Sequence, residues 1–303
     1  MRPFIGIKIT VLWKSLFLII TFYIRIPKHY ERNLRRSTVP GAFDRSRKSA
    51  VVRSISSNYS KALSSYFGTR TPDSKEAQGS HEAYVTALRA HGTEVTILPE
   101  LPDFPDSCFV EDTAVMVQNK AIIPNMGHPT REGEQQAVME HMSNFTEIVR
   151  MPKGAKLDGG DIVFFDDRFL LGLSTRTNKE GAEFLSHFIK EDGYDVELIQ
   201  VPDTTLHLTT VCSSPREGTI IAAEGHLKES QLSQIAEEII WIPNNESYAS
   251  NTIGYSNDRL IIAAGFPKTK NILQNEGFKL MSVDMEPIMQ ADGSLTCLSV
   301  FTS

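Results

Sequence analysis

The chain has 303 residues, a hydrophobic fraction of 41% and a net charge of −6, which indicates a folded protein with one large domain or two modest ones. Residues 1–53 hold 12 Lys and Arg against Glu31 and Asp44, a net of 12 − 2 = +10, so the remainder carries −6 − 10 = −16. An acidic body argues against nucleic acid as a partner and suits a small cation such as a guanidinium.

The cysteines Cys108, Cys212 and Cys297 lie far apart, with no CxxC spacing. This pattern indicates neither a disulfide framework nor a thiolate zinc site. We therefore expect the main body in a reducing compartment, the cytoplasm.

The amino-terminal segment, residues 1–49, differs in composition from the rest. Residues 4–24 are largely apolar, with Lys8 and Lys14 interrupting, and basic residues follow. The uninterrupted run 15–24 is about half of the ~20 residues that span a bilayer. We interpret 4–24 as a candidate membrane anchor or signal-like segment; the alternatives are an extension dispensable for folding and a start codon placed too far upstream. Residues 26–49 are expected to form a poorly ordered linker.

From residue 50 the chain repeats a unit of strand, polar turn, strand, helix and strand. The first full unit has strands at 113–118, 121–124 and 147–151 and a helix at 131–142. The same order recurs over residues 162–201, with a helix at 179–190, over 210–242, with a helix at 229–237, and over 252–283, with a helix at 268–275. Intervals of roughly 40 to 50 residues between turns are typical of solenoids and propellers.

The two ends of the repeating region supply one more unit. A strand at 50–53, a helix at 80–90 and a strand at 95–98 begin it, and an alternating strand at 295–301 lacks a partner. Pairing the first strand with the last closes a ring and removes its free edges. We predict a single closed five-unit α/β propeller domain over residues 50–303; an open α/β sheet is the alternative.

Polar residues stand at equivalent places, just before the first strand of each unit. They are Glu111 and Asp112, the run Asp158-Gly159-Gly160-Asp161, His207, Asn251 and, on the last strand, Cys297. In a ring these positions meet at the centre. A thiol nucleophile, a histidine for proton transfer and carboxylates that receive a cation form a coherent chemical set.

Five motifs resemble those of dimethylarginine dimethylaminohydrolase, a family of the guanidine-modifying amidinotransferase superfamily. They are FPDSCFVEDTAVM (104–116), LDGGDI (157–162), GLSTRTNKEGAE (172–183), LHLTT (206–210) and DGSLTCLSV (292–300). The resemblance implies a closed five-unit α/β propeller and hydrolysis of asymmetric dimethylarginine or monomethylarginine to citrulline and dimethylamine or methylamine, through an S-alkylthiouronium intermediate on cysteine.

The same resemblance implies a role for individual residues. Cys297 is expected to be the nucleophile, His207 the general acid and base, and Asp158 the carboxylate that orients the histidine. Asp106, Glu111 and Asp112 would receive the guanidinium and amino groups of the substrate, and Arg131 and Arg176 its α-carboxylate. Leu63 would lie on a lid, and Ala291 and Asp292 would lie at the pocket just ahead of the nucleophile strand. No metal or other cofactor is expected.

Two positions depart from the family pattern, and other functions stay open. Ala291 replaces a Val or Ile, and Asn125 stands where the family has an arginine. The alternatives are an arginine deiminase-like enzyme acting on arginine or another guanidine compound, and a non-catalytic guanidine-binding module. The expected partner is a small methylated arginine, with membrane contact only through residues 4–24. A monomer and a homodimer are both compatible with the sequence.

Overall fold

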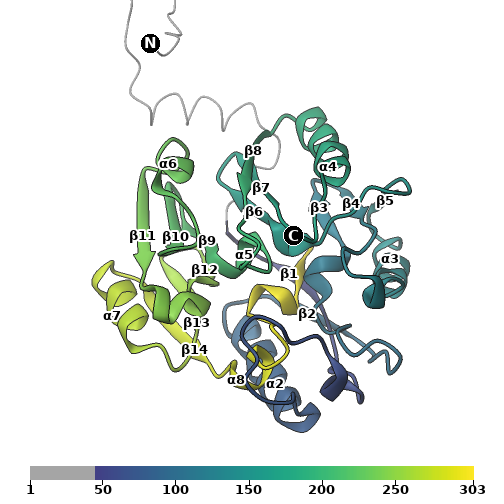
Figure 1. The fold of residues 1–303 in the computed structure, drawn as a ribbon, viewed down its shortest axis with the longest axis horizontal. Coiled ribbons are helices and arrows are strands. Elements are labelled where there is room, and N and C mark those ends of the chain that lie inside the picture. Colours follow the sequence, from purple (N-terminus) through teal and green to yellow (C-terminus); the bar gives the residue numbers. More distant parts are fainter. Residues whose placement is uncertain (1–44) are drawn as a thin grey trace, which may run out of the picture.

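A computed structural model describes residues 45–303, which form five three-stranded sheets around one central axis (Figure 1). In each sheet an inner strand pairs antiparallel with a middle strand, and the outer strand lies parallel to the middle one. A helix connects the middle strand to the outer strand in each unit, as a parallel pair requires a crossover connection. The predicted propeller is confirmed.

Four units follow one another along the chain. The first contains β3 (Val115–Val117), β4 (Lys120–Ile123), α3 (Gln135–Met142) and β5 (Glu147–Arg150), and the second contains β6 (Ile162–Phe165), β7 (Arg168–Leu173), α4 (Lys179–Glu191) and β8 (Asp195–Gln200). The third contains β9 (Cys212–Arg216), β10 (Thr219–Ala223), α6 (Glu229–Leu232) and β11 (Glu238–Ile242). The fourth contains β12 (Ile253–Tyr255), β13 (Arg259–Ala263), α7 (Pro267–Asn275) and β14 (Lys279–Val283).

The fifth unit joins the two ends of the described chain. It contains β1 (Ser49–Arg53), α2 (Ser74–Ala90), β2 (Glu94–Leu98) and β15 (Val300–Phe301). Ala50 pairs with Phe301 and Val51 with Val300 in antiparallel register. The pairing of the first strand with the last, predicted from the repeat, is confirmed.

Short helical turns precede the inner strands in all five units. These turns are η2 (Val110–Thr113), η4 (Gly159–Asp161), α5 (Leu208–Val211), η5 (Asn244–Ser250) and η6 (Thr296–Leu298). Neighbouring turns contact one another in the order η6, η2, η4, α5 and η5. The polar positions identified in the repeat therefore lie on adjoining turns near the axis.

Several predicted boundaries were wrong. The helix predicted at 229–237 ends at Leu232, with Ser233 as its C-cap. Residues 295–298 are not strand, because Leu295 adopts helical angles and Thr296–Leu298 is a helical turn, so Cys297 lies ahead of β15. The helix predicted from Arg131 begins at Gln135, because Gly133 has a φ of 115° and interrupts it. The helix α2 begins six residues earlier than predicted, where the Asp73 carboxylate accepts N–H bonds of 2.9 Å from Lys75 and Glu76 and caps the helix.

Remaining short elements are η1 (Tyr59–Lys61), η3 (Pro129–Arg131) and α8 (Glu286–Met289). The apolar side chains form five buried clusters, and several of these clusters combine strands of two neighbouring units. The cluster around Val51, for example, also holds Val300, Val110 and Ile123. This packing fixes the turns that carry the polar residues, as a precise site requires.

Residues 1–44 lie outside the described residues, and with them the candidate anchor at 4–24 and most of the predicted linker at 26–49. The last residues of that linker are packed against the body, contrary to the prediction. Arg45 is 5% exposed, and its Nη2 lies 2.6 Å from Ser214 Oγ and 3.3 Å from Asp166 Oδ1. The packed region thus starts before residue 50. Across residues 45–303 the longest helices are too short or too polar to cross a bilayer.

Candidate active site

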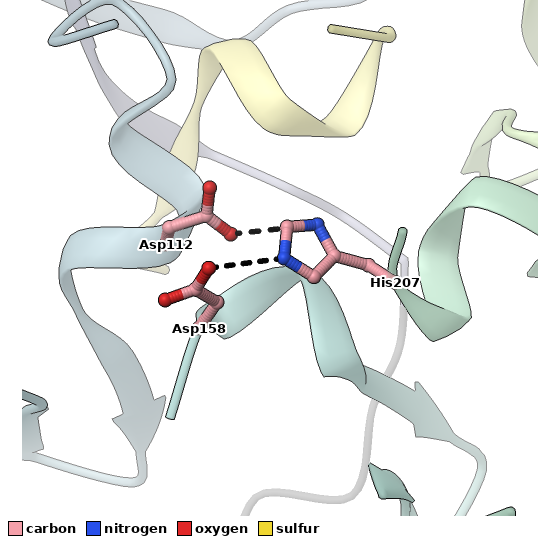
Figure 2. A group of neighbouring side chains, drawn as sticks. All are labelled: Asp112, Asp158 and His207. Carbon is pink, nitrogen blue, oxygen red and sulfur yellow. Dashed lines mark hydrogen bonds and ion pairs between the residues drawn. The ribbon is translucent and has the colours of Figure 1, made fainter. Parts of the chain in front are cut away.

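At the centre of the site the His207 imidazole lies between two carboxylates from neighbouring units, as Figure 2 shows. Its Nε2 is 3.1 Å from Asp158 Oδ2, and its Nδ1 is 4.0 Å from Asp112 Oδ1. His207 precedes α5 as its N-cap, Asp158 precedes η4 and Asp112 lies within η2. All three side chains are almost completely buried, so the group is shielded from solvent.

Two glycines allow the turns to approach this closely. A Cβ atom on Gly160 would lie 2.6 Å from His207 Nδ1 and 3.0 Å from Asp112 Oδ1. A Cβ atom on Gly159 would lie 2.0 Å from the Glu111 carbonyl oxygen. The paired glycines between Asp158 and Asp161 are therefore required by contact with the neighbouring turns.

The Asp161 carboxylate binds the backbone next to His207 and two hydroxyl groups. Its carboxylate accepts bonds from the Ser174 and Thr177 hydroxyls, both at 2.6 Å, and from the Leu208 N–H at 3.0 Å. Because Leu208 follows His207 directly, Asp161 fixes the turn that presents the imidazole. The place of Asp161 in the LDGGDI motif does not by itself indicate this role.

The surrounding charges favour the protonated form of His207. Burial lowers its pKa, but the Asp112 charge, the hydrogen bond with Asp158 and the Asp161 charge raise it to about 9. Burial would raise the pKa of Asp158, but the hydrogen bond and charge of His207, followed by Arg131 and Arg176, lower it to about 2. The pair therefore rests as imidazolium and carboxylate near neutral pH.

The side-chain amide of Asn251 holds the turn that carries Cys297. The Asn251 side chain accepts the Thr296 N–H at 3.1 Å and donates to Thr296 Oγ1 at 2.9 Å and to the Thr209 carbonyl at 2.8 Å. The Ser294 hydroxyl lies 3.3 Å from Cys297 Sγ. Asn251 thus links the nucleophile turn to the turn that follows His207.

The Glu111 carboxyl interacts both with the turn that carries Cys297 and with Asp112. It accepts the Thr296 hydroxyl at 2.9 Å, and burial followed by the Asp112 charge raises its pKa to about 8. Burial, Glu111 and Asp112 raise the pKa of the Cys297 thiol well above its ordinary value. With no cation bound, the thiol is neutral.

Of the predicted pocket residues, Leu63 and Asp106 lie together. The Leu63 N–H donates to Asp106 Oδ1 at 3.0 Å, and burial raises the pKa of Asp106. Ala291 is 3% exposed and packs in the apolar cluster that also contains Cys297.

The Asp292 carboxylate binds backbone N–H groups of the loop that follows Leu63. The side chain accepts backbone N–H bonds from Tyr66 at 3.0 Å, Phe67 at 2.7 Å and Gly68 at 3.2 Å, and a further bond from Ser65. The neighbouring Gln290 accepts the N–H groups of Thr69 and Arg70. A contact of Asp292 with substrate stays a prediction, and the bonds in this structure show that the Asp292 side chain holds the loop that follows Leu63.

The two predicted carboxylate-binding arginines differ in their surroundings. Arg131 is 3% exposed and binds Asp112 Oδ2 at 2.5 Å, Glu134 Oε2 at 2.9 Å and the Phe109 carbonyl at 3.0 Å. Arg176 is less enclosed, with one bond of 3.2 Å from Nη1 to Asp158 Oδ2. A contact of Arg131 with substrate stays a prediction, and its bonds in this structure favour a role in holding Asp112.

Asp112, Asp158 and His207 also offer ligand atoms that all lie within 4.8 Å of one another. Arg131 and Arg176 already bind the two carboxylates, and the Asp158 oxygen that faces His207 receives the Arg176 bond. We interpret the group as a proton-transfer arrangement, since its contacts are accounted for by hydrogen bonds and ion pairs.

Similarity to known proteins agrees with this geometry. The family model described as "N,N dimethylarginine dimethylhydrolase, eukaryotic" matches residues 63–301. The dimethylarginine dimethylaminohydrolase of Pseudomonas aeruginosa is 32% identical over 231 residues, which are 76% of this chain and 89% of that protein.

Two solved structures extend the similarity to the fold. The P. aeruginosa protein, as a cysteine-to-serine mutant complexed with citrulline, has a TM-score of 0.77 and 30% identity. A dimethylarginine dimethylaminohydrolase adduct with S-methyl-L-thiocitrulline has a TM-score of 0.78 and 30% identity. Each covers 84% of this chain and 99% of the matched chain.

Proposed function

Because this chain belongs to the dimethylarginine dimethylaminohydrolase family, we propose that its buried Cys297, His207 and Asp158 hydrolyse Nω-methylated arginine to citrulline. The released amine is dimethylamine from asymmetric dimethylarginine and methylamine from monomethylarginine. The observation that carries this proposal is the buried imidazole of His207 between Asp158 and Asp112, on turns adjoining those of Glu111 and Cys297.

The substrate itself supplies the charge that the resting site lacks. Glu111 and Asp112 raise the pKa of the Cys297 thiol, and a guanidinium bound against these carboxylates neutralises their effect. The same cation lowers the pKa of Glu111, so that its carboxylate forms when the substrate binds. We assign Asp106, Glu111 and Asp112 to the cationic groups of the substrate and Arg176 to its α-carboxylate, for which a guanidinium is suited.

When the cation is bound, the Cys297 thiol loses its proton to solvent, and in the first chemical step the resulting thiolate adds to the guanidinium carbon. The bond from that carbon to the methylated nitrogen then breaks, and His207 gives its proton to the departing amine. The product on the enzyme is an S-alkylthiouronium, with Asp158 holding the imidazole in place.

In the second step His207, now neutral, takes a proton from water. The resulting hydroxide adds to the thiouronium carbon, the carbon–sulfur bond breaks with loss of the added hydroxyl's remaining proton to solvent, and citrulline leaves with Cys297 regenerated as thiolate. The buried position of the group keeps solvent from competing for the charges that orient the substrate.

The proposal is tested by incubating the full chain with asymmetric dimethylarginine, monomethylarginine and arginine and measuring citrulline from each. We expect turnover of the methylated substrates at rates well above that of arginine. Turnover of arginine alone would overturn the substrate assignment and favour the deiminase-like alternative. Binding without any citrulline would favour the guanidine-binding module.

We further propose that residues 50–303 form a single catalytic domain. This domain works in the cytoplasm as a monomer or homodimer, and residues 4–24 provide any membrane contact. The three buried free cysteines support a reducing compartment. Fractionation of cells that express the full chain tests the location, and sedimentation of the purified protein tests its oligomeric state.

A further inference from the structure

A cavity of about 510 Å³ extends along the inner strands β3, β6, β9 and β15. The exposed residues Lys48 and Ser303 lie at its rim, and Glu111 and Thr296 line it next to the turn of Cys297. The predicted substrate residues do not line it; these are Leu63, Asp106, Arg131, Arg176 and Asp292. The cavity therefore approaches the site from the strand side, away from the substrate pocket.

Glu111 lies between this cavity and the thiol. Its Oε2 accepts the hydroxyl of Thr296, the residue before Cys297, at 2.9 Å. The Glu111 side chain is half-buried, whereas Cys297 is 7% exposed and does not line the cavity. Water in the cavity thus reaches the carboxyl of Glu111 and does not reach the sulfur directly.

The two carboxylates beside the imidazole have both oxygens engaged. Asp158 accepts a backbone N–H at Oδ1 across 2.7 Å and the Arg176 guanidinium at Oδ2 across 3.2 Å. Asp112 accepts a backbone N–H at Oδ1 across 2.9 Å and the Arg131 guanidinium at Oδ2 across 2.5 Å. Glu111 accepts a hydroxyl and forms no ion pair with the Lys, Arg and His side chains of residues 45–303. Of the three carboxyl groups, it is therefore the one that can take up a proton without breaking an ion pair.

The protonation states of the site agree with this assignment. The imidazolium of His207 already holds the proton that the departing amine requires. Burial and then the Asp112 charge raise the pKa of Glu111 to about 8, and hydrogen bonds with Thr296 and Cys297 act in the opposite direction. A bound guanidinium lowers this pKa, so that Glu111 gives its own proton to water and becomes a carboxylate. Three further groups have pKa values that respond to the Glu111 charge, namely Cys297, Arg47 and Tyr84.

We propose that the Glu111 carboxylate takes the proton of the Cys297 thiol and passes it to water in the cavity along the inner strands. The S–H bond breaks, its electron pair stays on sulfur as thiolate, and an O–H bond forms on Glu111. That O–H bond then breaks as the proton moves to water, and the carboxylate is restored beside the bound guanidinium. This inference rests on the proposed function, and it gives a catalytic role to a residue so far assigned to binding the cation.

Replacement of Glu111 by glutamine separates proton transfer from charge. The amide of Glu111→Gln still accepts the Thr296 hydroxyl but takes up no proton. We expect kcat for monomethylarginine at about pH 7 to fall about 100-fold, the usual contribution of a general base. Between about pH 7 and pH 9 the kcat of the variant should rise about tenfold per pH unit, because hydroxide must remove the thiol proton.

A role through charge alone predicts the opposite result. Burial and then the Glu111 charge raise the pKa of Cys297, so removal of that charge would make the thiolate form more easily. A variant Glu111→Gln that keeps its kcat and gains activity at lower pH would overturn the proposal. The matched control is Glu183→Gln on α4, an exposed residue paired with Lys179, for which we expect no change.

Small anions supply a second readout in Glu111→Ala, with urea unfolding to show that the variant is folded. Formate and nitrate are both planar and carry one negative charge, but nitrate is a far weaker proton acceptor. We expect formate to raise kcat at least about tenfold and nitrate to raise it less than about twofold. Acceleration by neither anion, or by both equally, would overturn the assignment of Glu111 as the proton acceptor.

The route of the proton is tested by varying the substrate in the same rescue experiment. Formate that enters along the cavity reaches the site while monomethylarginine is bound, so its half-saturating concentration should not change as the substrate concentration increases. Competition between formate and substrate would show entry through the substrate pocket and would contradict the route along the inner strands.

Measurements with the unmodified protein keep the two questions apart. Absence of citrulline from monomethylarginine in that protein contradicts the proposed function. Normal turnover there, combined with a kcat of Glu111→Gln within about twofold of the unmodified value, contradicts the role of Glu111 alone.

Discussion

The contact between Gly160 and His207 makes a sharp prediction about catalysis. In Gly160→Ala the new methyl group would lie 2.6 Å from His207 Nδ1 and 3.0 Å from Asp112 Oδ1. Carbon atoms do not approach these distances in folded proteins, so the imidazole must retreat by several tenths of an ångström from its place between Asp112 and Asp158.

The magnitude follows from the sensitivity of catalysis to position. A misplacement of about 1 Å costs roughly 100-fold in rate, so a shift of several tenths should cost about 10- to 50-fold in kcat. Substrate carboxylate binding at Arg176 is unaffected by the change, and KM should stay within about threefold.

The assay measures citrulline formation from monomethylarginine, together with urea unfolding to show that the variant is folded. Gly79→Ala is the matched control, because Gly79 lies inside α2 and a Cβ atom there meets nothing within 4 Å. It should keep full activity and gain about 0.5–1 kcal/mol in unfolding free energy. Full activity of a folded Gly160→Ala would refute the reasoning.

Three further changes test other parts of the account. Asp292→Ala removes the acceptor of the Tyr66, Phe67 and Gly68 N–H groups. The free energy of opening this loop should fall by about 2 kcal/mol, so deuterium exchange at residues 65–68 should become about 30-fold faster. Unchanged exchange would show that Asp292 does not hold the loop. The pKa of His207 is raised from 6.5 to about 9, so its charge stabilises the fold fully below pH 6.5 and this contribution is lost as the pH rises through 9. The unfolding free energy of the unmodified protein relative to His207→Gln should therefore fall by about 3 kcal/mol between pH 6.5 and pH 10 in urea titrations; a constant difference would contradict the raised pKa. The pKa of Glu111 is raised from 4.5 to about 8, so folding becomes less favourable as the pH rises through this range. Glu111→Gln should therefore gain unfolding free energy relative to the unmodified protein between pH 4.5 and pH 8. A difference that stays constant with pH would contradict the raised pKa of the buried carboxyl.

The sequence predicted the fold well because the fold is repetitive. Strands such as 162–165, 219–223 and 279–283 have the bounds expected from their apolar pattern, and the polar residue before each inner strand marks the axis. The pairing of Ala50 with Phe301 followed from the need to complete the fifth unit. These features are local or periodic, so a single sequence carries them.

The site was predicted less completely because its roles depend on contacts far apart in the chain. Asp292 was predicted to contact the substrate, and its bonds to a loop more than 220 residues earlier became visible only in the structure. Arg131 resembles a carboxylate ligand, and its pairing with Asp112 across 19 residues became visible only in the structure. The spacing of Arg131 and Glu134, three residues apart, was the available signal that this guanidinium forms an ion pair within the protein.

Cys297 shows how local pattern misleads. The alternation in 295–301 predicted a strand, but the Thr296 N–H and hydroxyl bind Asn251 and Glu111, and these tertiary bonds hold a helical turn. The thiol consequently sits on the same kind of turn that carries Asp112 and Asp161.

The most direct test of the central claim is the mass of the protein during turnover. Enzyme mixed with monomethylarginine and quenched in acid should carry a thiouronium adduct on the peptide that contains Cys297, and Cys297→Ser should show neither adduct nor citrulline while still binding substrate. Citrulline formation by Cys297→Ser at a rate comparable to the unmodified protein would contradict nucleophilic catalysis by Cys297.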